Sequence, residues 1–225
     1  QIDSQSGDIV LLIASWWFDT LICHSIRKPN RKKSMSLIQK LKARAAEGRP
    51  VRVAVIGAGK FGSMYLSQAP RTPGIHVVAV ADLSPERARA TLARVDWDAP
   101  RMSATSLAQA VKEGSTFITD DAPAVIASEF VDMVIDATGS PAAGIAHALL
   151  CCEHRKHIIM VNVEADVLAG PLLARRAKEA GIIYSMASGD QPALIAEMVD
   201  WARTIGLEVV CAGKGTKYLP VYHQS

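Results

Sequence analysis

A predicted β-strand that runs directly into a glycine-rich turn constrains the fold of this chain more than any other feature. The strand covers residues 51–56, and Gly57-Ala-Gly59-Lys-Phe-Gly62 follows it in the pattern Gly-x-Gly-x-x-Gly. The first glycine permits a tight strand-to-helix turn, the second lets a pyrophosphate approach the backbone, and the third lets the helix pack closely on the strand. Asp82 ends the next predicted strand, 20 residues after Gly62 (82 minus 62). Together these features predict a dinucleotide-binding turn, with the phosphates at the helix N-terminus.

A second loop, at the end of the predicted strand 131–137, is expected to face this turn. In Asp136-Ala-Thr-Gly-Ser-Pro141, Gly139 permits close approach while Thr138 and Ser140 offer hydroxyl groups. The alternatives are a turn that only caps the next helix and, for the first loop, a turn that only serves packing. The residues expected to contact the cofactor are Gly57, Gly59, Lys60, Phe61, Gly62, Asp82, Arg87, Ala137, Thr138 and Gly139.

Strands and helices alternate along most of the chain, which requires right-handed crossovers and a parallel sheet covered on both faces. The sequence therefore predicts an α/β fold with a doubly wound parallel sheet. We expect a Rossmann NAD(P)-binding domain over residues 51–162 and the start of a catalytic domain, apparently truncated, over residues 163–225. Strands are expected at 51–56, 75–81, 116–119, 131–137, 157–161, 182–184 and 208–212, and helices at 35–46, 60–69, from 84, 103–112, from near 122, 141–153, 167–180 and 192–205.

Composition and charge exclude some classes of function. Hydrophobic residues make up 49% of the chain and aromatic residues only 5%, which suits helices packed on parallel strands. The net charge is +3, with +5 in residues 1–49 (nine Lys/Arg minus four Asp/Glu) and therefore −2 in the remainder. Because the basic stretch 27–49 lacks interleaved aromatic residues, we expect a solvated leader and no nucleic-acid partner.

Residues 1–34 are expected to be an extension of doubtful function. Their apolar run, 9–18, is well short of the roughly 20 residues of a membrane span, and positive charge follows the run where a signal peptide would have it first. A docking segment built on Trp16 and Trp17 is the alternative. Residues 35–50 then read as an amphipathic helical arm. The cysteine spacing favours a reducing, cytoplasmic compartment, and we expect no membrane association.

Five segments of the chain resemble one group of enzymes, the homoserine-dehydrogenase-like oxidoreductases that include the 1-deoxy-D-xylulose 5-phosphate reductoisomerase-like (DRL) proteins. The first two segments, residues 53–62 and 135–141, are shared by many dehydrogenases, whereas the other three together are more specific. These are Val161-Asn-Val-Glu-Ala-Asp166, Ser188-Gly-Asp-Gln-Pro-Ala-Leu-Ile-Ala-Glu197 and Gly213-Lys-Gly-Thr-Lys-Tyr218. The resemblance covers Met35 to the end, and members of the family continue beyond the point where this chain stops.

The resemblance implies a function in isoprenoid biosynthesis. A DRL protein would rearrange 1-deoxy-D-xylulose 5-phosphate and reduce the product to 2-C-methyl-D-erythritol 4-phosphate with NADPH. Homoserine dehydrogenases carry an Asn-Lys pair near residues 162–164, and sugar dehydrogenases carry Glu-Lys-Pro there. This chain has Val163-Glu164-Ala165, so neither homoserine oxidation on the usual pattern nor lysine-based proton transfer is expected.

The cofactor indications conflict. Asp82 should accept hydrogen bonds from the adenosine ribose hydroxyls and repel a 2′-phosphate, which favours NAD. The resemblance implies NADP. Either Arg87 or Arg89 could turn toward a phosphate and offset the carboxylate, and we expect NAD(P) with a preference for NADP.

The catalytic candidates are Glu164, Asp190, Lys214 and Lys217. Glu164, Asp190 and Glu197 could surround a divalent cation or share acid–base work, while the lysines would supply charge for a phosphate or an enolate oxygen. Asp190 could equally cap the next helix, Glu197 could face solvent, and the lysines could be surface residues. The histidines, including His147 and His154, form no metal-binding pattern and are expected at ordinary polar positions.

The leading hypothesis is a pyridine-nucleotide oxidoreductase that acts on a small phosphorylated, sugar-derived carbonyl substrate. A homoserine-dehydrogenase-like enzyme is one alternative. A truncated nucleotide-binding protein without turnover is the other. Apolar surface left by the helical arm and the missing part of the catalytic domain could be covered by a second copy in a homo-oligomer.

Overall fold

The computed structural model describes residues 36–189 and 191–213, without the side chains of residues 191 and 192. The chain divides into two compact units, residues 1–40 and 41–225. The helix α2 (Leu37–Ala46) begins in the first unit, and all other described elements belong to the second. None of the described helices has the length and apolar content needed to cross a membrane.

Six parallel strands form one sheet in the order β3-β2-β1-β4-β5-β6. The strands are β1 (Val51–Ile56), β2 (Ile75–Ala81), β3 (Phe117–Thr119), β4 (Met133–Asp136), β5 (His157–Met160) and β6 (Tyr184–Met186). The order reverses between β1 and β4, which pair directly, with Ile56 opposite Asp136. The doubly wound parallel sheet predicted from the sequence is therefore confirmed.

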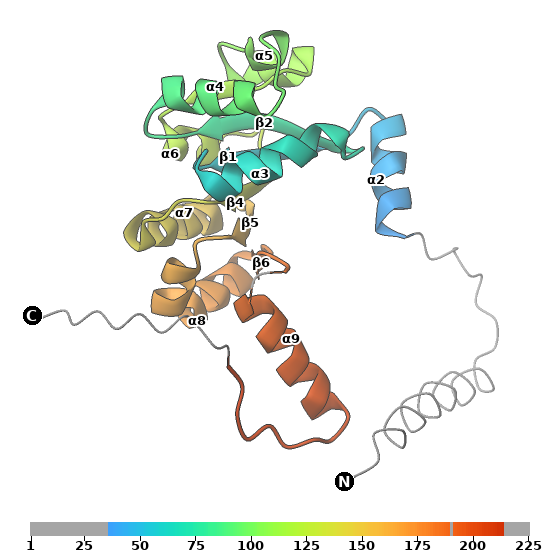
Figure 1. Ribbon diagram of the computed structural model, residues 1–225, viewed down its shortest axis with the longest axis vertical. Coiled ribbons are helices and arrows are strands. Elements are labelled where there is room, and N and C mark those ends of the chain that lie inside the picture. Colours follow the sequence, from blue (N-terminus) through green and yellow to red (C-terminus); the bar gives the residue numbers. More distant parts are fainter. Residues whose placement is uncertain (1–35, 190, 214–225) are drawn as a thin grey trace, which may run out of the picture. The chain divides into compact units, whose positions relative to one another are not determined.

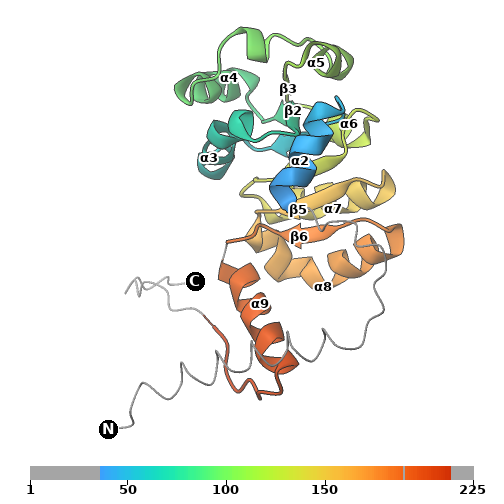
Figure 2. The same cartoon turned by 90° about the vertical axis from the view of Figure 1, so that its right-hand side faces the viewer.

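Helices cover both faces of this sheet (Figure 1, Figure 2). They are α3 (Lys60–Gln68), α4 (Pro85–Arg94), α5 (Leu107–Glu113), α6 (Ala122–Ala127), α7 (Pro141–Glu153) and α8 (Val163–Ala180), with 3-10 turns at Ala69–Arg71 and Pro100–Met102. The last described helix, α9 (Gln191–Thr204), extends away from the sheet (Figure 1, Figure 2).

Alternate residues of β1 serve two separate cores. Val53 and Val55 pack with Leu66 of α3 and Leu92 of α4. Ala54 and Ile56 pack on the other face, in the core that includes the buried side chains of α6, α7 and α8. Because side chains alternate across a strand, one short apolar run supplies both cores, as a sheet buried on both faces requires.

Polar caps and prolines set where several helices begin. The hydroxyl of Ser84 accepts a hydrogen bond from the backbone N–H of Arg87, and α4 starts with Pro85. The hydroxyl of Ser140 caps α7 in the same way, again followed by a proline. Both satisfy an otherwise unpaired N–H while proline fixes the first helical φ angle.

Some predicted boundaries are wrong. Residues 208–212, expected as a strand, form neither strand nor helix. Helix α8 begins at Val163 and not at 167, because Asn162 accepts a hydrogen bond from Ala165 N and caps it. Strand β6 is shifted from 182–184 to 184–186, and α5 starts at 107 after a separate 3-10 turn. Since β6 joins the same sheet, the sheet extends past residue 162, the expected domain boundary.

Candidate functional site

The three glycines of the turn after β1 have different surroundings. Gly57 has a φ of 95°, and a Cβ built on it would lie 2.8 Å from the carbonyl oxygen of Ala137. A Cβ on Gly62 would collide with the carbonyl oxygen of Gly57. A Cβ on Gly59 would meet nothing within 4 Å. The first and third glycines are thus required by the fold, whereas Gly59 leaves open space that a ligand can approach.

A cleft of about 420 Å³ opens at the carboxyl ends of β1, β2 and β4, where the strand order reverses. This is the place at which open α/β sheets bind ligands. Of the residues expected to contact a cofactor, Gly57, Gly59, Asp82, Arg87, Ala137, Thr138 and Gly139 line it, together with Asp120, Pro123 and His147.

A second cavity, of about 640 Å³, adjoins the cleft and shares Gly59, Asp82 and Arg87 with it. Lys60, at the start of α3, and Arg94, on α4, line this second cavity. Phe61 and Gly62, also expected at the cofactor site, line neither cavity: Phe61 is exposed, and Gly62 is buried against the turn.

Asp82 is held by donors from three directions. Its Oδ2 accepts a hydrogen bond from the backbone N–H of Ala58 at 2.8 Å, and its Oδ1 accepts from Ser84 N at 3.1 Å and Arg87 Nη2 at 3.0 Å. Burial by itself would raise the pKa of this carboxyl group, but these three hydrogen bonds outweigh it and lower the pKa. The carboxylate is therefore ionised and fixed beside the glycine turn.

The structure distinguishes the two arginines considered from the sequence. Arg87 turns toward the cleft and pairs with Asp82, although most of its side chain is exposed. Arg89 instead donates from Nη1 to the carbonyl oxygen of Met102 at 2.9 Å. Only Arg87 is thus positioned beside the cofactor cleft, and its positive charge partly offsets that of Asp82.

The loop after β4 is fixed by a network that the sequence did not predict. Asp136 is fully buried, and its Oδ2 lies 2.7 Å from Nδ1 of His147 on α7. The sequence assigned His147 to an ordinary polar position. Helical spacing could have placed it, because it lies in register with Gly144, Ala148 and Cys151, which are the buried residues of α7.

The described catalytic candidates lie outside the cleft lining. Glu164 is exposed in the first turn of α8, and Glu197 is exposed on α9. Asp190, Lys214 and Lys217 fall outside the described residues. Within residues 36–189 and 191–213, no group of three or more His, Cys, Asp or Glu side chains could hold a metal ion.

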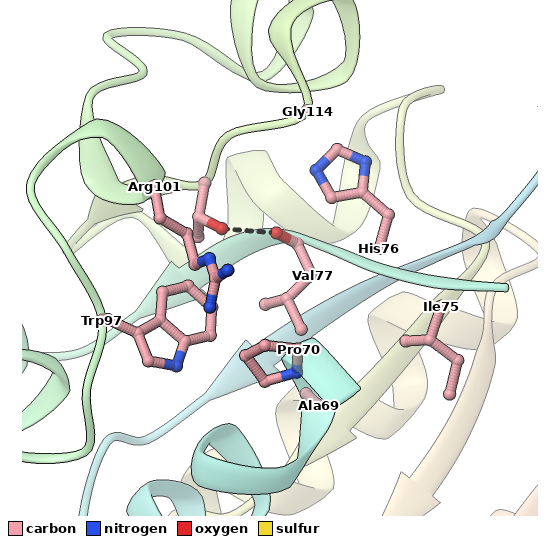
Figure 3. Close-up of a pocket in the computed structure, with 9 residues that line it drawn as sticks. Ala69, Pro70, Ile75, His76, Val77, Trp97, Arg101 and Gly114 are labelled. Atoms are coloured by element: carbon pink, nitrogen blue, oxygen red, sulfur yellow. Dashed lines mark hydrogen bonds between the residues drawn. The ribbon is translucent and has the colours of Figure 1, made fainter. Parts of the chain in front are cut away.

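A smaller cavity, of about 180 Å³, lies at the opposite edge of the sheet, beside the amino end of β2 (Figure 3). Arg101 lines this cavity, and its guanidinium group stacks over the ring of Trp97 at 5.5 Å from the ring centroid. The hydroxyl of Thr116 donates to the carbonyl oxygen of Val77 at 2.6 Å, the bond drawn in Figure 3. Both polar groups therefore have partners within the protein. The cavity lies away from the glycine turn, which follows the carboxyl end of β1.

Two family models match parts of the chain. Residues 51–161 match the oxidoreductase family with an NAD-binding Rossmann fold, and residues 189–225 match the catalytic domain of oxidoreductase DRL. Residues 51–161 are thus similar to the NAD-binding Rossmann domain of that family, and the end of the chain is similar to a DRL catalytic domain. No curated protein matches the chain.

Several solved structures are similar to part of the chain at low sequence identity. An NAD-binding oxidoreductase from Klebsiella pneumoniae is 16% identical, with a TM-score of 0.47 over 70% of this chain and 39% of that one. A myo-inositol dehydrogenase from Lactobacillus casei, in complex with NAD(H) and myo-inositol, is 16% identical, with a TM-score of 0.47 over 68% and 42%. A homoserine dehydrogenase from Thiobacillus denitrificans is 18% identical, with a TM-score of 0.47 over 61% and 29%. The chain spans less than half the length of each.

Proposed function

We propose that this chain is an NAD(P)-dependent oxidoreductase of the DRL type that reduces a small phosphorylated, sugar-derived carbonyl compound. The observation that carries the proposal is the cleft at the carboxyl ends of β1 and β4, with the open Gly59 on one side and the ionised Asp82 at its edge. A bound nicotinamide cofactor supplies the hydride for such a reduction.

The residues around the cleft fit a dinucleotide. The N-terminus of α3 follows the glycine turn and provides unpaired N–H groups for the pyrophosphate. Asp82 provides a carboxylate for the adenosine ribose hydroxyls. The loop after β4, with Thr138 and Ser140, lines the part of the cleft beyond the glycine turn and would contact the nicotinamide side. The adenosine half would then lie toward β2 and the nicotinamide half toward β4.

The proposed cofactor is NADP, with NAD as the alternative. A 2′-phosphate would extend from the ribose beside Asp82 into the second cavity, which three cationic side chains line: Lys60, Arg87 and Arg94. Arg87 can bind this phosphate because its guanidinium group is exposed and can exchange its contact with one oxygen of Asp82 for a contact with a phosphate oxygen. Asp82 would keep its two backbone donors.

The proposed substrate is 1-deoxy-D-xylulose 5-phosphate, and the proposed product is 2-C-methyl-D-erythritol 4-phosphate. The match of residues 189–225 to the DRL catalytic domain supports this choice. The linear carbon skeleton of this substrate would first rearrange to a branched aldehyde by a retroaldol/aldol step, and the aldehyde would then take up a hydride at its carbonyl carbon and a proton at its oxygen. We assign Glu164, Asp190, Lys214 and Lys217 to substrate binding and proton transfer.

Two measurements test the proposal on the full chain. NADPH and NADH are titrated by fluorescence, and oxidation of the bound form is then assayed with 1-deoxy-D-xylulose 5-phosphate and with aspartate semialdehyde. We expect NADPH binding and oxidation with the sugar phosphate. Oxidation with aspartate semialdehyde alone would favour a homoserine-dehydrogenase-like enzyme. Binding with no oxidation in either assay would favour a nucleotide-binding protein without turnover.

A further inference from the structure

The carboxylate of Asp136 connects three parts of the cofactor cleft. It is the last residue of β4 and is fully buried. Its Oδ1 accepts hydrogen bonds from the backbone N–H of Thr138 at 3.0 Å and from the Thr138 hydroxyl at 2.7 Å, and its Oδ2 contacts His147 Nδ1 at 2.7 Å. A buried carboxylate is stable only with such donors. Asp136 therefore ties the strand end to both the following loop and helix α7.

The network continues to the start of α8. The side-chain amide of Asn162 is buried and donates from Nδ2 to the hydroxyl of Thr138 at 3.1 Å and to the carbonyl oxygen of Ser140 at 2.8 Å. Its Oδ1 accepts from Ala165 N. The loop 137–140 is thus held from both sides at its closest approach to Gly57. A loop fixed in this way is preorganised for a ligand.

The second ring nitrogen of His147, Nε2, is accessible to solvent. An ionised carboxylate can only accept, so Nδ1 of His147 carries the hydrogen of the bond to Asp136. Nε2 has no partner among the described residues, and it is not one of their buried, unpartnered polar atoms. Since His147 lines the cleft, Nε2 is accessible from it.

We propose that Asp136 and His147 act as a positioning pair for the nicotinamide half of the bound dinucleotide, with Nε2 of His147 accepting a hydrogen bond from a hydroxyl group of its ribose. This inference rests on the proposed function. Asp82 and the second cavity define the adenosine side of the cleft, whereas His147 lies with Thr138 and Ser140 on the other side. Asp136 acts through His147 and the loop, and touches no ligand itself.

The test uses His147→Asn in the full chain. The amide nitrogen of asparagine can replace Nδ1 and keep the bond to Asp136, while nothing replaces Nε2. Dissociation constants are measured for the dinucleotide that the wild-type chain binds more tightly, NADPH or NADH. They are also measured for its adenosine half alone, adenosine 2′,5′-bisphosphate or AMP. The matched control is His154→Gln, an exposed histidine at the end of the same helix.

We expect His147→Asn to weaken dinucleotide binding about tenfold, the loss of one hydrogen bond. Binding of the adenosine half and the melting temperature should stay unchanged, as should all properties of the control. Asp136→Asn should weaken dinucleotide binding at least as much. If that variant does not fold, His147→Asn alone decides the test.

Two outcomes would overturn the inference. Unchanged dinucleotide affinity in His147→Asn would show that Nε2 contacts no ligand, and the proposed function would stand. An equal loss for the dinucleotide and for its adenosine half would show a general structural role. If the wild-type chain binds neither NADPH nor NADH, the proposed function fails, and this inference fails with it.

Discussion

At the residue scale, the glycines of the turn differ in what an added methyl group would meet. Gly59→Ala should leave the free energy of unfolding nearly unchanged, because its Cβ would meet nothing within 4 Å. The same methyl group would occupy the space that a pyrophosphate needs, and we expect the dissociation constant for NADPH to rise about tenfold or more. Fluorescence titration and urea unfolding measure the two effects separately.

Gly62→Ala is the matched comparison. Its Cβ would collide with the carbonyl oxygen of Gly57, which is backbone and cannot rotate away. We expect a loss of about 2 kcal/mol in the free energy of unfolding, the usual effect of overpacking. If Gly62→Ala were as stable as the wild type, the close packing of α3 on β1 would not depend on this glycine.

The two arginines of α4 provide a test of cofactor preference. Arg87→Ala should raise the dissociation constant for NADPH about tenfold and change that for NADH much less. Its guanidinium lies beside Asp82, where a 2′-phosphate would be bound. Arg89→Ala is the control, since Arg89 bonds to Met102. Equal weakening of NADPH and NADH by Arg87→Ala would mean that Arg87 supports the ribose site and does not select the phosphate.

Sequence pattern predicted the residues whose roles follow from backbone geometry. The spacing of the glycines and of Asp82 fixes where they stand relative to a strand end, and the structure places Gly57, Gly59 and Asp82 at one cleft. The pair Asp136–His147 could not be predicted in the same way. It depends on how α7 packs on β4, which brings together residues that are 11 positions apart.

At the element scale, β1 and β4 are connected by an ion pair as well as by backbone hydrogen bonds. Arg52 donates from its backbone N–H, Nε and Nη2 to the carboxylate of Asp132. Burial would raise the pKa of Asp132, but the hydrogen bonds from Arg52 outweigh it and lower the pKa. A carboxyl group whose pKa is lower in the folded than in the unfolded state stabilises the folded state at pH values above the unfolded-state pKa. This stabilisation is lost as the pH falls through the folded-state pKa.

Asp132→Asn should therefore reduce the free energy of unfolding at pH 7. We expect a loss of about 1 kcal/mol, because both side chains are partly exposed and solvent screens the pair. The difference from the wild type should shrink below about pH 4, where the unfolded carboxyl group also binds a proton. Urea unfolding at several pH values checks this, with the exposed Asp200→Asn as control. A difference that is independent of pH would assign the effect to packing.

The order of the elements was predictable from periodicity, whereas some of their ends were not. The continuous apolar run of β1 is buried on both faces, and it can be recognised as a strand from the sequence. Residues 208–212 have a similar pattern but form no strand, because a strand requires a neighbouring edge as well as suitable residues. The predicted start of α8 at residue 167 is wrong because Asn162 caps the helix earlier. Asn162 also belongs to the network around Thr138, which the sequence does not show.

At the scale of the whole molecule, ligand binding and folding stability are linked. A ligand that binds only the folded state stabilises it, and at a concentration 100 times its dissociation constant the gain is about 2.7 kcal/mol. For a chain of 225 residues, this corresponds to a rise of about 5–10 °C in melting temperature. The glycine turn, Asp82 and the loop after β4 come from separate parts of the sequence, so their common ligand should stabilise the sheet that carries them.

We therefore expect NADPH to raise the melting temperature of the wild-type chain by this amount and that of Gly59→Ala by about half as much or less at the same concentration, because a tenfold higher dissociation constant leaves a gain of about 1.4 kcal/mol. Differential scanning fluorimetry measures both. The comparison is informative because the two proteins should melt at the same temperature without ligand, since nothing lies within 4 Å of the added methyl group. An equal rise in both proteins would place the ligand away from the glycine turn, because a Cβ at residue 59 affects only a ligand that approaches that backbone.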